Sequence, residues 1–179
     1  MTRIEADRNA QRSLCHPGFY EILSDISRGL ESVQKSLDDF LENKRQKFPR
    51  FYFLSNEDLL AILGHSKDPT LIQPHIKKCF EGIKKLEMVM STELKERKCK
   101  ISGMYDPNEE YVPFINNGVT IEKLGKTEVE HWLEEVERAM MNTLKKKLWD
   151  CYSQLGPNTR GDKIIGWIES YPGQLVITA

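Results

Sequence analysis

A regular apolar stripe runs through residues 17–47 and is the first clear pattern in the sequence. Its members recur at alternating spacings of four and three, which is typical of one face of an α-helix: Phe19, Leu23, Ile26, Leu30, Val33, Leu37 and Phe40. Pro17 suits the first helical turn, and Pro49 disfavours helix at Phe48, so we expect the helix to end there. The stripe predicts packing against neighbouring helices, with an intermolecular coiled coil as the alternative.

Shorter elements follow this helix. Phe51–Leu54 is an apolar run that we interpret as an extended connector or a short strand. Ser55 begins a new helix in a pattern that resembles a capping box with Asp58, and Gly64 ends it. The next helical stretch is divided by Pro74.

Residues 84–122 change to an alternating pattern that predicts β-structure. We expect a β-hairpin at about residues 98–115, with Pro107 in the second position of its turn, and a further strand at Leu86–Met90. An isolated hairpin is marginally stable, so the insertion should lie on the helices.

Helix returns in residues 127–179. Thr127 and Glu130 resemble a second capping box, and the acidic residues that follow look like a solvated helix face. A last short helix precedes the apolar run 175–179, which looks like a cut inside an element, so we interpret the chain as a piece of a longer polypeptide.

Together these patterns predict a mainly α protein: an elongated helical-bundle rod with a small β-hairpin insertion. Its parts are a helical part at 17–83, the insertion at 84–122 and a second helical part at 127–179. The first helix would be about 45 Å long at about 1.5 Å per residue. A compact chain of this length would measure only about 40 Å across, which is why we expect an elongated shape.

The composition narrows the function classes. The chain is 39% hydrophobic and 30% charged with a formal net charge of −1, which suits an ordinary soluble domain and gives no argument for nucleic acid. No apolar run approaches the roughly 20 residues that span a membrane. The four cysteines are widely spaced, which favours reduced thiols: Cys15, Cys79, Cys99 and Cys151.

Recognisable catalytic chemistry is missing from the sequence. Gly125-Lys126-Thr127 resembles the end of a phosphate-binding P-loop, but the required earlier glycine is replaced by Thr120, and Gly118 comes two residues too early. The four histidines have no metal-ligand spacing with another histidine or a cysteine. We therefore name no catalytic, cofactor-binding or metal-binding residue.

Several blocks in the same order resemble the linker region of dynein heavy chains. The block Lys44–Leu63 carries the most specific part of the resemblance, with Phe48, Pro49, Arg50 and Phe51 followed by Leu54 and Ser55. Further similar blocks cover nearly the whole chain: Asp68–Glu87, Ile101–Phe114, Val129–Met140 and Trp167–Ile177. Leu54-Ser55-Asn56 and Tyr171-Pro172-Gly173-Gln174 look more like the axonemal branch than the cytoplasmic one.

The resemblance implies a mechanical role without catalysis in this segment. It implies an arched helical rod that lies across the AAA+ ring of the same heavy chain and bends during the power stroke. ATP and Mg²⁺ would bind elsewhere in the parent chain. The implied partners are that ring and, indirectly, microtubules and other dynein subunits, with no nucleic acid or membrane. The implied location is the cytoskeleton, in the axoneme of a cilium or flagellum or otherwise in the cytoplasm.

One departure from the family concerns the hairpin turn. Many relatives carry a glycine-containing acidic turn, whereas this chain has the sequence DPNEE, which is stiffer. We expect the polar residues of this turn to contact the ring: Asp106, Asn108, Glu109 and Glu110. Loops 64–69 and 156–161 are candidate hinges, with ordinary inter-helix loops as the favoured interpretation of each. The alternative function is a helical scaffold or adaptor that binds a partner helix through the 19–40 stripe.

Overall fold

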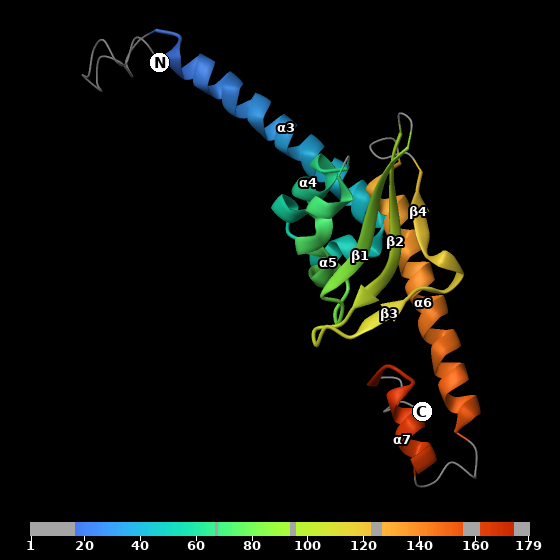
Figure 1. Cartoon of the computed structure of the whole chain (residues 1–179). Helices are drawn as coiled ribbons and strands as arrows, with labels where there is room; N and C mark the ends of the chain where they lie inside the picture. The colour runs from blue at the N-terminus through green and yellow to red at the C-terminus, as the bar shows by residue number, and fades with distance from the viewer. Residues whose placement is uncertain (1–16, 67, 94–95, 123–126, 156–161, 174–179) are drawn as a thin grey trace. The chain divides into compact units, whose positions relative to one another are not determined.

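The computed structural model describes residues 17–66, 68–93, 96–122, 127–155 and 162–173 (Figure 1). The chain divides into two compact units, Met1–Asn43 and Lys44–Ala179. The candidate hinge 156–161, the run 175–179 and most of the P-loop-like segment lie outside the described residues.

The long helix is present as expected. Helix α3 spans Phe19–Lys47 and stops directly before Phe48 and Pro49, so both its existence and its end are confirmed. Most of its apolar stripe is exposed, with Leu30 and Val33 at 65% and 66% exposure.

The segment after α3 is helical, which corrects our expectation of an extended run at Phe51–Leu54. Pro49–Phe53 forms the 3₁₀-helix η1, and the N–H of Leu54 donates to the carbonyl of Phe51 at 3.1 Å. Proline fixes φ near the helical value and needs no hydrogen-bond partner in a first turn, so Pro49 favours this short helix.

Two helical elements complete this part of the chain. Helix α4 spans Asn56–Gly64, and the Ser55 hydroxyl accepts the Asp58 N–H at 3.1 Å, which confirms the predicted cap. The 3₁₀-helix η2 (Pro69–Ile72) leads into α5 (Gln73–Cys79), and Pro74 lies in the first turn of α5, so the predicted division of this stretch is confirmed one residue before Pro74.

The β-insertion is larger than the predicted hairpin. Four antiparallel strands form one sheet, with β2 in the centre: β1 Lys85–Glu93, β2 Glu96–Tyr105, β3 Tyr111–Pro113 and β4 Val119–Ile121. On one side β2 pairs with β1, where Leu86 lies opposite Met104. On its other side β2 pairs first with β4 and then with β3 along its length.

The final strand was missed because a tight turn precedes it. Strand β3 ends at Pro113, and the 3₁₀-helix η3 (Ile115–Asn117) follows. Asn116, Asn117 and Gly118 all have positive φ, which reverses the chain and returns it to β2 as β4. A Cβ atom at Gly118 would lie 2.0 Å from the carbonyl oxygen of Ile101, so only glycine fits there.

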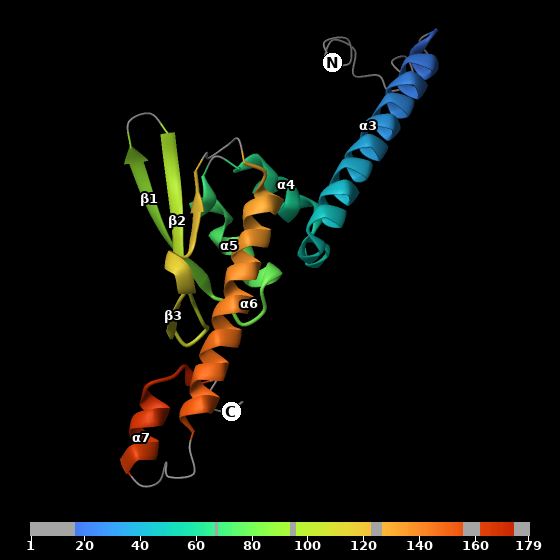
Figure 2. The same ribbon diagram turned by 90° about the vertical axis from the view of Figure 1, so that its right-hand side faces the viewer.

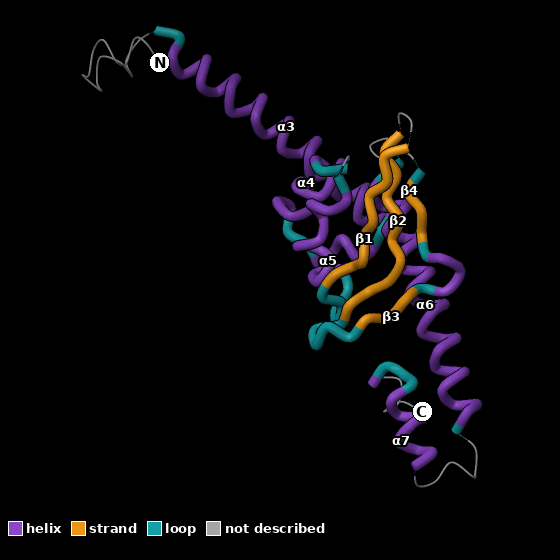
Figure 3. The backbone as a smooth tube through the Cα atoms, viewed as in Figure 1, coloured by secondary structure: helices purple, strands orange, loops and turns teal. Residues whose placement is uncertain are grey.

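Helices α5 and α6 lie on the same side of the sheet (Figures 2 and 3). Helix α6 spans Val129–Gln154 and α7 spans Asp162–Glu169. The core between sheet and helices contains fully buried residues from every layer: Ile76, Leu86, Ile101, Trp132, Leu133 and Val136. The protein is therefore mainly helical with a small four-stranded antiparallel sheet. None of the described helices is long and apolar enough to cross a membrane.

The second predicted capping box is wrong. The N-cap of α6 is Glu128, one residue after Thr127, and the Glu128 side chain makes no capping hydrogen bond. Glu130 is 5% exposed and pairs with Lys44, which lies 86 residues earlier in the sequence.

Candidate functional site

The residues of the family-specific block lie at the centre of the second unit. Phe48 and Phe51 are buried with their rings edge-to-face at 5.0 Å, and Phe80 lies 6.4 Å from Phe48. Leu54 is buried beside them, while Ser55 caps α4. The aromatic residues therefore belong to the core, since ring pairs of this geometry add to the burial of apolar area.

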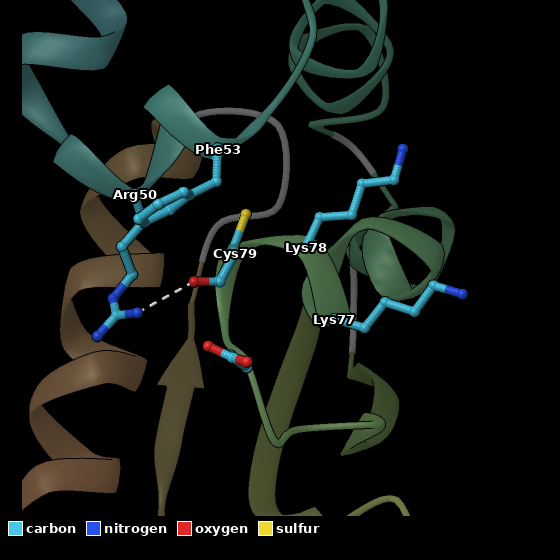
Figure 4. A pocket seen from close by; sticks show the side chains of 6 residues that line it. Arg50, Phe53, Lys77, Lys78 and Cys79 are labelled. Carbon is cyan, nitrogen blue, oxygen red and sulfur yellow. Dashed lines mark hydrogen bonds between the residues drawn. The ribbon is translucent and has the colours of Figure 1, made fainter.

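Arg50 is the polar centre of this block. Its Nε donates to Glu137 Oε1 of α6 at 2.8 Å, and its Nη1 donates to the Cys79 carbonyl at 3.1 Å. The guanidinium also lies 4.7 Å from the ring centre of Phe80. One side chain thus connects η1 with the end of α5 and with α6, and Figure 4 shows the bond to Cys79.

Two lysines at the end of α3 form ion pairs with the start of α6. Lys44 Nζ lies 2.5 Å from Glu130 Oε1 and 3.6 Å from Glu128 Oε1. Lys47 Nζ lies 3.0 Å from Glu128 Oε2, which raises the pKa of Lys47 and lowers the pKa of Glu128. We call this set the charged junction: Lys44, Lys47 and Arg50 with Glu128, Glu130 and Glu137.

The interpretation of these glutamates as a solvated helix face is therefore only partly right. Glu130 is buried and Glu137 is half-buried, whereas Glu134 on the same helix is exposed. The sequence gives no local signal for the difference, because the basic partners of Glu130 and Glu137 lie more than 80 residues earlier, at separations of 86 and 87.

A cavity of about 310 Å³ lies beside Arg50 (Figure 4). Its lining comes from η1 and the end of α5: Arg50, Phe53, Lys77, Lys78, Cys79 and Glu81. Burial raises the pKa of the Cys79 thiol to about 11, so the thiol is protonated at neutral pH and is a poor nucleophile. The arrangement supports packing rather than covalent chemistry.

A Ser–Asp–His cluster lies between α4 and α5. The Ser55 hydroxyl donates to Asp58 Oδ2 at 3.1 Å, His75 Nδ1 lies 3.1 Å from Asp58 Oδ1, and Lys78 Nζ lies 2.6 Å from Asp58 Oδ2. A hydrolytic triad needs histidine between serine and the carboxylate, so that it can take the serine proton. Here Asp58 is central, and the cluster caps α4 and holds it to α5. Among the described residues, no three His, Cys, Asp or Glu side chains gather as a metal site.

The structure brings the predicted turn residues together between β2 and β3. The Glu109 N–H donates to the Asp106 carbonyl at 3.1 Å, and the Glu110 N–H donates to Asp106 Oδ1 at 2.7 Å. Asn108 Nδ2 donates to Asp106 Oδ2 at 3.2 Å. Glu109 has a φ of 69°, a conformation that favours glycine, and the turn is therefore built as glycine-containing hairpin turns are.

Two carboxylates of the turn have partners outside it. Glu109 Oε1 pairs with Lys84 Nζ at 2.6 Å, which lowers the pKa of Glu109. The Glu110 carboxylate accepts the backbone N–H of Gly173, whose nitrogen lies 3.2 and 3.3 Å from its two oxygens. Sequence reasoning missed this second contact.

A model of the family described as dynein heavy chain, N-terminal region 2, matches residues 1–151. The chain belongs to the dynein heavy chain family. It is 44% identical over its whole length to the Dynein-1-beta heavy chain, flagellar inner arm I1 complex, of Chlamydomonas reinhardtii. It is also 45% identical over its whole length to the mouse Dynein axonemal heavy chain 2, and 40% identical over 90% of its length to the mouse Dynein axonemal heavy chain 3.

The chain spans about 4% of the length of these curated relatives. The relatives are axonemal heavy chains, so the resemblance to a dynein heavy chain of axonemal type is confirmed.

Proposed function

We propose that this chain is part of the mechanical linker of an axonemal dynein motor. In this proposal its helices form part of a bundled, arched rod that lies across the AAA+ ring of the same heavy chain. The rod converts ATP-driven changes of the ring into the power stroke for microtubule-based movement. The family match supports the proposal, together with the mainly helical fold.

The charged junction is the observation that carries the mechanical role. A lever transmits force only if its joints resist rotation. Glu130 and Glu137 lie two turns apart on α6, about 10 Å at about 1.5 Å per residue. Lys44 and Arg50 engage these two points separately, and a joint that is held at two separated points resists bending better than a joint with one.

The remaining parts of the proposal concern partners and location. ATP and Mg²⁺ bind in the ring, elsewhere in the heavy chain, and the segment itself has no catalytic role. Microtubules and other dynein subunits are indirect partners, and the site of action is the axoneme of a cilium or flagellum. Turn residues Asp106, Asn108, Glu109 and Glu110 contact the ring differently in different nucleotide states, because equal contacts could not switch the linker.

The test measures movement and ATP hydrolysis separately in the heavy chain that contains this segment. Arg50→Gln removes the guanidinium from the junction, and Arg28→Gln on exposed α3 is the matched control, since Arg28 pairs only with nearby Asp25 among the contacts described for it. We expect R50Q to lower microtubule gliding velocity several-fold while ATP hydrolysis persists. If R50Q folds and glides like the control, the mechanical role is wrong. Charge reversal at Glu109 and Glu110 should also alter velocity.

A helix-docking scaffold is the second candidate, and the exposure of the α3 stripe favours it. Leu23, Ile26 and Leu30 are 47%, 52% and 65% exposed along one helix face. Such a face is suited to another helix. Sedimentation of the chain at increasing concentration tests this reading: self-association that Leu30→Glu abolishes would support it, and a monomer at all concentrations would count against a second copy as the partner.

A further inference from the structure

The Glu110–Gly173 contact connects parts of the chain that are 63 residues apart. Glu110 lies in the turn between β2 and β3, and Gly173 follows α7 by four residues. Both carboxylate oxygens face the same N–H group, at 3.2 and 3.3 Å. Glu110 is half-buried and Gly173 is exposed, so the bond lies where other donors can reach the carboxylate.

The segment that carries Gly173 is also held to the end of α6. Trp167 Nε1 of α7 donates to the Cys151 carbonyl at 3.0 Å. The Tyr171 ring lies 6.4 Å from the Trp167 ring, and burial together with the nearby Asp150 and Cys151 raises the pKa of Tyr171. Residues 162–173 are therefore held at two places, the end of α6 and the turn.

Of the three carboxylates in the turn, only that of Glu110 holds residues 162–173 in the contacts described. Asp106 is occupied inside the turn by the N–H of Glu110 and by Asn108. Glu109 pairs with Lys84, directly before β1. Among the carboxylates of the turn, Glu110 is the one whose described side-chain contacts reach the segment after α7, at Gly173.

We infer that Glu110 is a releasable latch that holds residues 162–173 on the β2–β3 turn. The second half of the inference rests on the proposed function: a cationic group of the AAA+ ring, such as a guanidinium, competes for the same carboxylate. A cation forms a stronger hydrogen bond with a carboxylate than a neutral backbone N–H does. In this proposal the guanidinium binds both carboxylate oxygens, which are the two atoms that now face Gly173, and thereby frees the α7 segment.

The latch is tested in the isolated chain by amide hydrogen exchange with NMR detection. Glu110→Ala should raise the exchange rate of the Gly173 amide about tenfold, because a hydrogen bond to a charged group is lost. It should also shift the Trp167 indole resonance. Glu110→Gln keeps a neutral acceptor and should give a smaller increase. Glu109→Ala, next in sequence and paired with Lys84, should change the Gly173 rate less than twofold.

The outcomes separate the latch from the wider proposal. An unchanged Gly173 rate in both Glu110 variants would overturn the latch without affecting the linker role. In the heavy chain, residues 162–173 should exchange faster in the nucleotide state in which the ring contacts the turn, and the Glu110→Ala variant should exchange fast in every state. Equal wild-type rates in all nucleotide states would overturn the competition with the ring, while R50Q gliding separately decides the linker role.

Discussion

Removing Lys44 from the Lys44–Glu130 ion pair should destabilise the chain more than removing Glu130. Glu130 is 5% exposed and the Lys44 side chain 14% exposed, and their charged atoms lie 2.5 Å apart. Lys44→Met removes the main counter-ion of a buried carboxylate. Glu130→Met leaves a lysine that still has Glu128 at 3.6 Å and a flexible stem that can turn toward water.

The magnitudes follow from the burial of the two groups. Removal of one partner of a buried ion pair costs about 3–5 kcal/mol. Lys47 lies 3.8 Å from Glu130 and compensates in part, so we expect K44M to cost about 3 kcal/mol. E130M should cost about 1 kcal/mol because Lys44 keeps a partner. The double variant replaces the pair by apolar groups and should cost only about 1 kcal/mol, which gives a coupling energy of about 3 kcal/mol.

Urea denaturation followed by circular dichroism and by tryptophan fluorescence, to which buried Trp132 contributes, measures these differences. For a chain of this size, 3 kcal/mol also corresponds to a decrease in Tm of about 6–12 °C. Lys47→Met is the matched control, since Lys47 is 47% exposed and should matter less. The reasoning would be refuted by a double variant that loses as much stability as both single variants together, or by K44M and K47M behaving alike.

Three further predictions concern the turn, the carboxylates and the thiols. Gly118→Ala should lower the free energy of unfolding by at least about 3 kcal/mol, because its Cβ would lie 2.0 Å from a backbone oxygen at a φ of +80°. Asp58 and Glu109 have lowered pKa values, so their stabilisation is present at neutral pH and should be lost below about pH 4 in urea titrations. Cys79 and Cys99, with pKa values of about 11, should react slowly with iodoacetamide at pH 8 until urea unfolds the chain.

Each of these predictions has an internal control. Gly64→Ala adds a Cβ atom where no atom lies within 4 Å and should be nearly neutral, so equal losses at both glycines would contradict the steric argument. Asp58→Asn and Glu109→Gln should each reduce the loss of unfolding free energy as the pH falls. If the free energy of unfolding fell with pH as steeply in both variants as in the wild type, the pKa argument would be contradicted. Rapid labelling of Cys79 or Cys99 in the native chain would show that the thiols are not protected.

Regular periodicity made the long helices predictable from the sequence. The bounds of α3 follow from its stripe and from Pro49, and those of α4 follow from Ser55 and Gly64. Strand β4 has only three residues, too few for an alternating pattern, and its place depends on the positive φ of three preceding residues. Short elements of this kind are decided by tertiary contacts.

Of the candidate site, the sequence indicated the block that contains Arg50 but not the residues that Arg50 binds. Resemblance indicated the block that contains Arg50, but its acceptors Glu137 and Cys79 lie 87 and 29 residues away. Glu130 shows why such partners escape sequence reasoning. Its position three residues after Thr127 suits a capping box. In the structure, however, its carboxylate is buried and needs a counter-ion, which Lys44 supplies.

The two groups of contacts differ in strength in a way that suits a lever. The charged junction combines several ion pairs and includes the buried carboxylate of Glu130. Separating these pairs would leave that carboxylate charged, poorly hydrated and without its main counter-ion. The Glu110 latch is one hydrogen-bonded group that can exchange a backbone N–H for another donor at little cost. Under the proposed linker function, the latch should therefore open under load before the junction does. A linker with this order of strengths can release α7 and still transmit force through α6.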